Sequence, residues 1–417
     1  MDSLNRSIQL SRAAASLVVS IQVVSQWLLF LEENDGSERK KSVFQQRLAW
    51  DTYVANNKDR PIFKRHLRMT YESFRSLLLL INGHMKDVDK KMAHIRGGEV
   101  IKELRLYAAI RYMAGASYSD ICFFCGISQS TFYRVLWETI HAINLSIKIE
   151  FPTTAQECAV VASGFERKSY RSVLKNVVGA LDGYLVHIVT PKKTKNRNVR
   201  SYFSGHYQKY GINIQACCDA ESRFTFMGVG GPGVIKDRSA LKESGLHDKV
   251  ESLPQGYVVI GDCAYQATEK LVPIFGGNLA LVPKNDNFNY FASQLRIRIE
   301  MAFGLMTRKW GILQRPLSNA PENVKHIILC IARLHNFCVD ERLKKNNRNK
   351  DHYYDTGSNR LDPEQQAYMD LAAEAEHEDI ISNEFPQWSR ARERLVQIVK
   401  DLGYTRPTKS SGKRKRD

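Results

Sequence analysis

Apolar residues recur along the chain in two patterns, and the change from one to the other divides the sequence. Up to about residue 150 they follow one another at steps of three and four, which predicts amphipathic helices. From about residue 172 they form short continuous runs bounded by Gly, Pro and Asp, which is typical of buried strands. The patterns predict four regions: a poorly defined extension over 1–60, a helical domain over 61–150, an α/β domain over 172–340 and a charged tail over 341–417.

Helical periodicity is clearest over Met69–Ile81 and Ile101–Met113, the second of which ends before Gly115. Residues 32–60 are polar and charged, and we expect a linker or a loose helix there. The apolar run Ala13–Leu31 contains five Ser and Gln residues, so an amphipathic helix is a better interpretation than a membrane span or a signal peptide.

A more specific pattern follows in the helical domain. A short helix up to Cys125, a turn at Gly126 and a Ser128 cap that opens a second helix together predict a helix-turn-helix motif. In that geometry the first residues of the second helix reach the major groove of DNA. The candidates are Gln129, Ser130, Tyr133 and Arg134. The alternative is a plain helical hairpin in a bundle.

The α/β region predicts alternating strands and helices. Gly211–Asp219 alternates apolar and polar residues, as a half-buried strand does, and Phe224–Val229 is expected to return as its hairpin partner. In the long helix Asn287–Leu313, apolar residues from Leu295 to Trp310 form a core stripe, and Glu300 lies on a different stripe beside Arg296. The other expected elements are strands at Val177–Leu181, Leu185–Val189, Val258–Ile260 and Leu279–Val282 and helices from about Thr268 and over Asn323–Asn336.

Two of the apolar runs stop at an aspartate, Asp182 and Asp262. The ends of parallel strands are where open α/β sheets place their ligands, so we expect these two residues to share a site with Glu300. Three carboxylates held together need a counter-charge, which divalent cations with oxygen ligands supply. Each residue alone has an ordinary interpretation, because an Asp after a strand is commonly a turn residue and a helical Glu is commonly solvated. Only their joint order favours a metal site.

Charge and cysteine content narrow the class of protein. Sixty-one Lys and Arg against 44 Asp and Glu leave a net charge of +17, which favours a polyanionic partner, nucleic acid first and membranes second. Eight cysteines without framework spacing are typical of free thiols in a reducing compartment. The run Lys413–Arg416 predicts a nuclear localisation signal or a nucleic-acid patch. A loop contributes further candidate DNA contacts, or else a solvated charge run: Lys192, Lys193, Lys195, Arg197 and Arg200.

The chain resembles transposases of the PIF/Harbinger superfamily, including the Pong-like branch. The motifs that carry the resemblance lie within about 175–338; they include Gly179-Ala-Leu-Asp182-Gly-Tyr, Gly261-Asp262-Cys-Ala-Tyr265 and Arg298-Ile-Glu300. The resemblance implies a ribonuclease H-like mixed sheet flanked by helices. It also implies that Asp182, Asp262 and Glu300 form a DDE triad that holds two divalent metal ions, Mg²⁺ or Mn²⁺. It also points to Asp237 as an accessory acidic residue, and to a separate Myb-like DNA-binding partner protein.

The leading hypothesis is therefore a nuclear, metal-dependent DNA endonuclease and strand transferase. Water would cut the transposon end, and the freed 3′ hydroxyl would attack target DNA at the same carboxylates. Two alternatives stay open: a domesticated, non-catalytic DNA-binding protein, and a nuclease without strand transfer. We expect no membrane partner. The sequence does not specify the terminal repeat or the target sequence, and it leaves open whether the protein is a homo-oligomer.

Overall fold

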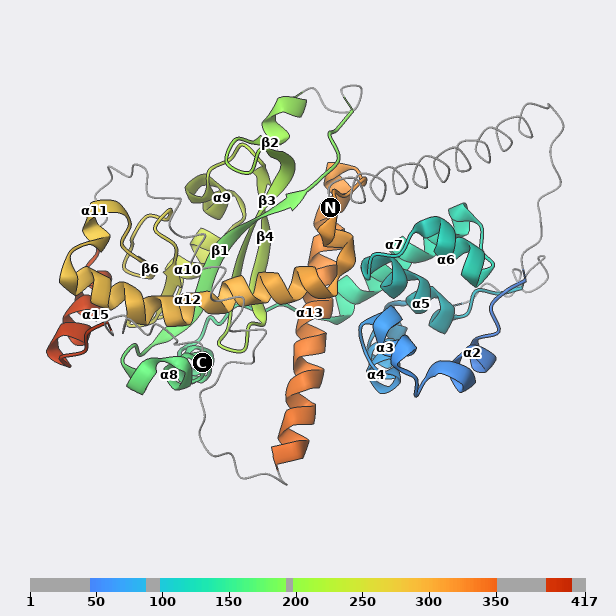
Figure 1. The fold of residues 1–417 in the computed structure, drawn as a ribbon, viewed down its shortest axis with the longest axis horizontal. Helices are drawn as coiled ribbons and strands as arrows, with labels where there is room; N and C mark the ends of the chain where they lie inside the picture. The colour runs from blue at the N-terminus through green and yellow to red at the C-terminus, as the bar shows by residue number, and fades with distance from the viewer. Residues whose placement is uncertain (1–45, 88–97, 193–197, 351–387, 407–417) are drawn as a thin grey trace, which may run out of the picture. The chain divides into compact units, whose positions relative to one another are not determined.

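The computed structural model describes residues 46–87, 98–192, 198–350 and 388–406 (Figure 1). The expected helix over 13–31, the acidic stretch around 364–379 and the basic run 413–416 lie outside these residues. Within the described ranges, no helix is both long and apolar enough to cross a membrane.

Over the described residues 46–87 and 98–168, the regular elements are all helices. The α-helices are α2 (Trp50–Asn57), α3 (Pro61–Leu67), α4 (Tyr71–Ile81), α5 (Lys102–Met113), α6 (Tyr118–Cys125), α7 (Gln129–Ser146) and α8 (Ala155–Lys168), with a short 3-10 turn, η1 (Asn82–His84), after α4. Helix α2 lies within the stretch expected to be a linker or a loose helix. Its Trp50 and Val54 are buried in the same core as α4 and α5, because the ring of Trp50 packs on Phe74 and Tyr107.

Helices α6 and α7 are joined by the tight turn that the sequence predicts. Gly126 ends α6 with a φ of 63°, and a Cβ there would lie 2.3 Å from the carbonyl oxygen of Gln46, so only glycine fits. The Ser128 hydroxyl accepts a hydrogen bond from the amide of Thr131 at 3.2 Å and caps α7. Cys125 is fully buried behind this turn and belongs to the core.

A six-stranded mixed sheet forms the second region. Strands β4 and β2 both pair with one side of β3, and the order continues β3-β1-β5-β6. The pairs β1–β3, β2–β3 and β3–β4 are antiparallel, whereas β1–β5 and β5–β6 are parallel. The strands are β1 (Val177–His187), β2 (Phe203–Ser204), β3 (Lys209–Cys218), β4 (Phe224–Pro232), β5 (Val258–Gly261) and β6 (Leu271–Pro273). This is the ribonuclease H-like order, and it confirms the predicted fold class.

Three local predictions are wrong. The runs Val177–Leu181 and Leu185–Val189 are one continuous strand, β1, so Asp182 lies within a strand and not at its end. No helix begins at Thr268, because the apolar residues that follow it form the buried edge strand β6. Leu279–Val282 is not a strand: Leu279 and Leu281 are 48% and 78% exposed, and the chain there forms a helical turn, α11 (Gly277–Ala280).

Strand β3 also differs from its prediction. Its polar–apolar alternation predicts a half-buried strand, but residues 211–218 are buried on both faces. The polar positions Asn213 and Gln215 face the interior, where they hydrogen-bond to each other at 2.9 Å. A central strand with satisfied buried amides has the same alternation as a strand at the surface.

Helices cover both faces of the sheet and create two cores. Successive residues of a strand point to opposite faces of the sheet. On β5, Val258 and Ile260 therefore belong to the large core, and Val259 belongs to a smaller one. The large core is completed by α12 (Pro283–Lys309) and α13 (Pro321–Lys350), which cross one another in Figure 1, and the smaller core by α8, α9 (Asp237–Glu243) and α10 (Leu246–Glu251). The remaining short 3-10 segments are η3 (Tyr170–Ser172), η4 (Val199–Tyr202) and η5 (Gly311–Gln314).

One further helix, α15 (Arg390–Asp401), lies in the stretch that charge alone assigns to the tail. It packs against α12 and the edge strand β6, with Leu395 and Val399 in the core. The guanidinium of Arg392 lies 4.0 Å from the ring centre of Phe275, a cation–π contact at a position that is 3% exposed. This helix extends the cover of the sheet as far as its last strand, β6.

Candidate active site

Strands β1 and β5 bring the two predicted aspartates to the same place on the sheet. They are parallel neighbours with Ala180 opposite Ile260, and continuing this register by two residues places Asp182 beside Asp262. Asp262 follows β5 directly and begins a turn closed by the amide of Tyr265, which donates to the Asp262 carbonyl at 3.2 Å. Although Asp182 lies within β1, the parallel pairing with β5 ends at Ala180, so both carboxylates stand where that pairing stops.

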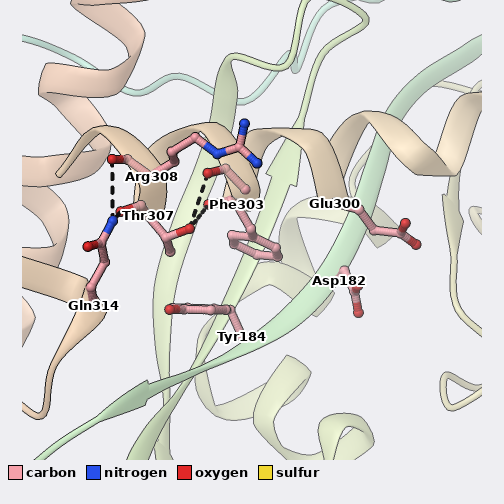
Figure 2. Close-up of a pocket in the computed structure, with 8 residues that line it drawn as sticks. Asp182, Tyr184, Glu300, Phe303, Thr307, Arg308 and Gln314 are labelled. Atoms are coloured by element: carbon pink, nitrogen blue, oxygen red, sulfur yellow. Dashed lines mark hydrogen bonds between the residues drawn. The ribbon is translucent and has the colours of Figure 1, made fainter. Parts of the chain in front are cut away.

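Helix α12 supplies the third carboxylate. Its core stripe is confirmed, because Leu295, Ile299 and Met306 are no more than 1% exposed, and this fixes the rotation of the helix on the sheet. Glu300 is then directed at β1, and Figure 2 shows its carboxylate next to that of Asp182. Glu300 is ion-paired with Arg296 one turn earlier on the same helix, and the Arg296 side chain is buried.

Asp182 is held in conditions that oppose its charge. Burial, with the neighbouring Asp262 and Glu300, raises the pKa of its carboxyl group to about 8, against the lowering effects of Arg296 and of the Gly183 amide. That amide donates to the Asp182 carboxylate at 2.7 Å. The cluster thus has more negative charge than its protein neighbours neutralise.

The residues fit a hard divalent cation. The donor set consists of carboxylate oxygens, which Mg²⁺ and Mn²⁺ prefer, and the raised pKa of Asp182 marks a desolvated acid that a cation would stabilise as the anion. Within the described part of the chain, no three His, Cys, Asp or Glu side chains converge closely enough to enclose an ion as they stand. The carboxylate of Glu300 is instead engaged by the guanidinium of Arg296.

An open cavity of about 450 Å³ adjoins the carboxylates. Asp182 and Glu300 form one end of it (Figure 2). The remaining wall is formed by Tyr184, Phe303, Gly304, Thr307, Arg308 and Gln314. Sequence reasoning missed this wall. The available signal was spacing: Tyr184 is two residues beyond Asp182 on a strand and Phe303 is three beyond Glu300 on a helix, so each shares a face with a candidate acid.

Asp237, the predicted accessory acid, is held differently. It opens α9 and accepts hydrogen bonds from the side-chain amides of Asn213 at 3.1 Å and Gln215 at 3.2 Å. Gln215 in turn accepts a hydrogen bond from the Tyr265 hydroxyl at 2.8 Å. Asp237 faces Gly183, on the side of β1 opposite to Asp182, because neighbouring strand residues point to opposite faces.

The candidate DNA contacts are accessible where the structure describes them. Gln129, Ser130 and Arg134 are exposed on the first turns of α7, and Tyr133 is partly exposed against the ring of Tyr118. In the basic loop, Lys192 and Arg200 are exposed, whereas Lys193, Lys195 and Arg197 lie outside the described residues.

Comparison with known proteins assigns a class to this region. Residues 181–336, from β1 into α13, match the family described as DDE superfamily endonuclease, so this part of the chain is a DDE-type endonuclease domain. The match spans Asp182, Asp262 and Glu300. The chain is also similar to the Arabidopsis thaliana protein named Protein ALP1-like, with 22% identity over 313 residues that cover 70% of this chain and 75% of that protein. No solved structure matches.

Proposed function

We propose that this protein is a metal-dependent DNA endonuclease and strand transferase of the Harbinger transposase type, in the Pong-like branch. One observation carries the proposal: Asp182 and Glu300 line one cavity, and the β1–β5 register continues to Asp262, whose charge acts on Asp182. In this proposal the three residues form the catalytic and metal-binding triad, and the match to a family of endonucleases supports it.

The residues would divide the work as follows. Asp182, Asp262 and Glu300 would hold one or two Mg²⁺ or Mn²⁺ ions, which when bound promote attack by water and stabilise charge on the phosphate. The water oxygen forms a bond to phosphorus while the bond to the 3′ oxygen breaks, and that oxygen leaves with a proton as a 3′ hydroxyl. The buried strands β1 and β5 keep the aspartates rigid. In strand transfer, the same carboxylates orient the 3′ hydroxyl against a phosphate of target DNA.

Positive charge supports DNA as the substrate. The net charge of +17 and the exposed Lys192 and Arg200 beside the sheet favour contact with the phosphate backbone. Exposed Gln129, Ser130 and Arg134, with Tyr133, are the proposed contacts of a DNA-binding helix-turn-helix formed by α6 and α7. Lys193, Lys195 and Arg197 extend the same basic loop in the sequence.

The cellular setting is part of the proposal. The basic run Lys413–Arg416 supports a nuclear location, where DNA is the accessible polyanion. A separate Myb-like protein would supply recognition of the transposon ends, and a homo-oligomer would bring two ends together. Co-purification of the full chain with a candidate partner on end-sequence DNA tests both assemblies.

A second candidate function is a non-catalytic DNA-binding protein. The observation that favours it is the ion pair between Arg296 and Glu300, which neutralises one carboxylate of the triad without a metal. In that case the basic surface and α7 would act alone, and the carboxylate site would be a structural remnant of a nuclease. A nuclease without strand transfer is the intermediate case.

The decisive experiment is DNA cleavage in Mg²⁺ by the full chain, supplied with its partner protein and a plasmid that carries the terminal repeats. We expect nicking by the wild type, none by Asp262→Ala, and full activity in the matched control Asp248→Ala, whose side chain is 90% exposed on α10. Wild-type protein that never nicks would refute the enzyme, and cleavage that survives Asp262→Ala would refute the triad. Pre-cut ends with a 3′ hydroxyl then test strand transfer separately.

A further inference from the structure

The cavity beside the carboxylates combines two kinds of wall. Asp182 and Glu300 supply negative charge at one end, and the rings of Tyr184 and Phe303 supply an apolar surface beyond them (Figure 2). We propose that this cavity binds one unpaired nucleobase of the DNA substrate, next to the phosphate that is cut. This inference rests on the proposed nuclease function and adds a subsite to it.

The aromatic surface is preorganised. The rings of Tyr184 and Phe303 are stacked, with centroids 5.1 Å apart and an interplanar angle of 25°. Phe303 is 6% exposed and is backed by Phe224, whose centroid lies 5.7 Å away, so the stack cannot collapse into the core. A rigid aromatic face in an open cavity is the feature on which single-stranded nucleic acid binders stack bases, at about 1–3 kcal/mol per base.

The aromatic surface lies next to the carboxylates at which we propose that DNA is cut. Tyr184 follows Asp182 by two residues on β1, and Phe303 follows Glu300 by three on α12. The aromatic pair and the acid pair are therefore neighbours on the same two elements, about one strand repeat or one helical turn apart. A nucleotide whose phosphate lies at the carboxylates has its base within reach of the rings.

The rest of the wall suits a base without selecting one. Gly304 lines the cavity without a side chain. The hydroxyl of Thr307 donates to the carbonyls of Phe303 and Gly304 at 2.9 and 3.2 Å, and the Gln314 amide donates to the Thr307 carbonyl at 3.2 Å. These donors are engaged with the helix backbone, so stacking dominates the recognition. Arg308 adds an exposed positive charge at the rim, where a neighbouring phosphate would lie.

The cavity volume of about 450 Å³ accommodates one nucleotide, and a base can stack on the rings of the wall only after it has left the stack of the duplex. The base must therefore be unpaired when the adjacent phosphate reaches Asp182 and Glu300. We expect cleavage to be favoured where the base pair beside the cut is mismatched or frayed, because the cost of unpairing is then already met.

The test is a binding experiment that does not depend on cleavage. Oligonucleotide duplexes of the terminal repeat carry, at each position around the cut, either the normal base or an abasic residue, and dissociation constants are measured in Ca²⁺. We expect Tyr184→Ala to lose affinity for the normal duplex by roughly fivefold to a hundredfold, which is the energy of one stacked base. At one position around the cut, the base is the one that enters the cavity. On the duplex that is abasic at this position, Tyr184→Ala should bind with the same affinity as the wild type.

Two further variants make the test specific. Tyr184→Phe keeps the ring and should bind like the wild type. Tyr170→Ala removes a half-exposed tyrosine at the other end of α12 and should show no dependence on the abasic residue. Because each variant is compared with itself on two duplexes, a general loss of folding cancels. Equal weakening on both duplexes at every position, or none at all, would overturn the subsite.

The outcomes also separate the two proposals. Protein that cleaves DNA but shows no coupling between Tyr184 and an abasic position keeps the nuclease function and loses the base subsite. Protein that shows the coupling but never cleaves keeps the subsite and loses the nuclease function.

Discussion

The two faces of strand β1 carry acids in opposite surroundings. On one face Asp237 receives two side-chain amide donors, from Asn213 and Gln215, within a closed polar network. On the other face Asp182 receives one backbone amide and lies near two further carboxylates, and its pKa is raised to about 8. A buried acid that the protein satisfies is part of the structure, whereas an acid cluster that the protein leaves undercompensated is suited to bind a cation.

The contrast between the two faces of β1 also explains why residue 183 is a glycine. Gly183 follows Asp182 on β1 and faces Asp237 of α9, and a Cβ there would lie 2.6 Å from the Asp237 carboxylate and 2.9 Å from the Gln215 amide nitrogen. The absence of a side chain lets the polar network pack directly against the strand that positions Asp182. The network face thereby supports the geometry of the carboxylate face.

The largest effect should follow from neutralising the undercompensated acid. We expect Asp182→Asn to lower the cleavage rate by at least about a hundredfold, because a neutral amide no longer neutralises a cation at the phosphate. The metal-free variant should nevertheless unfold at the same temperature as the wild type or a higher one, because an amide costs less to bury than a carboxylate. Mg²⁺ should raise the unfolding temperature of the wild type alone. A destabilised Asp182→Asn protein would contradict the contrast between the two faces.

A buried histidine on the carboxylate face provides a pH-dependent test. Burial lowers the pKa of His335 to about 4, against the raising effect of its hydrogen bond to the Ser222 carbonyl at 2.8 Å. The folded state therefore binds fewer protons than the unfolded state, whose histidine titrates near 6.5, so the stability is complete above 6.5 and is lost as the pH falls toward 4. The loss amounts to about 3 kcal/mol. Urea unfolding across this range should show it in the wild type and not in His335→Gln, and equal pH profiles would exclude His335 as the cause.

Gly183→Ala should disturb both faces together. The added methyl group forces the Asp237 and Gln215 side chains to move, at a cost of about 1–3 kcal/mol in the free energy of unfolding. Cleavage should fall as well, because β1 is displaced beside Asp182. The matched control is Gly205→Ala, where a Cβ would meet no atom within 4 Å. Unfolding curves and cleavage rates of the two variants decide the point, and an unaffected Gly183→Ala protein would separate the two faces.

The smallest effect is expected at Asp237 itself. Both amides donate to the same carboxylate oxygen, and Asp237→Asn retains an oxygen there, so the stability and the cleavage rate should change little. Asp237→Ala removes the acceptor and should cost about 1–3 kcal/mol. If Asp237→Asn abolished cleavage while remaining folded, Asp237 would act as a metal ligand and the structural role would be wrong. Thermal unfolding and cleavage measured in parallel distinguish these roles.

Much of the fold could be predicted from local patterns. The apolar stripe of α12, the cap and turn between α6 and α7, and the pairing of β3 with β4 follow from periodicity and turn chemistry, which act over a few residues. The errors occurred where burial overrides local pattern. The alternation of β3 suggested an exposed face, and Leu279–Val282 was apolar enough to suggest a strand although two of its leucines are exposed. A short stretch of sequence does not specify which strands pair with a given strand, or which elements bury its two faces.

The sequence by itself determined which acids follow buried runs and which helix carries Glu300 on a separate stripe, because these are properties of period and order. Only the tertiary structure decided their surroundings. The β1–β5 register places Asp182 beside Asp262, Arg296 pairs with Glu300, and Tyr184 and Phe303 form a stacked wall beside them. The same structure gives Asp237 its amide partners on the opposite face. These contacts join residues distant along the chain, and their energies depend on desolvation, which exists only once the core has closed.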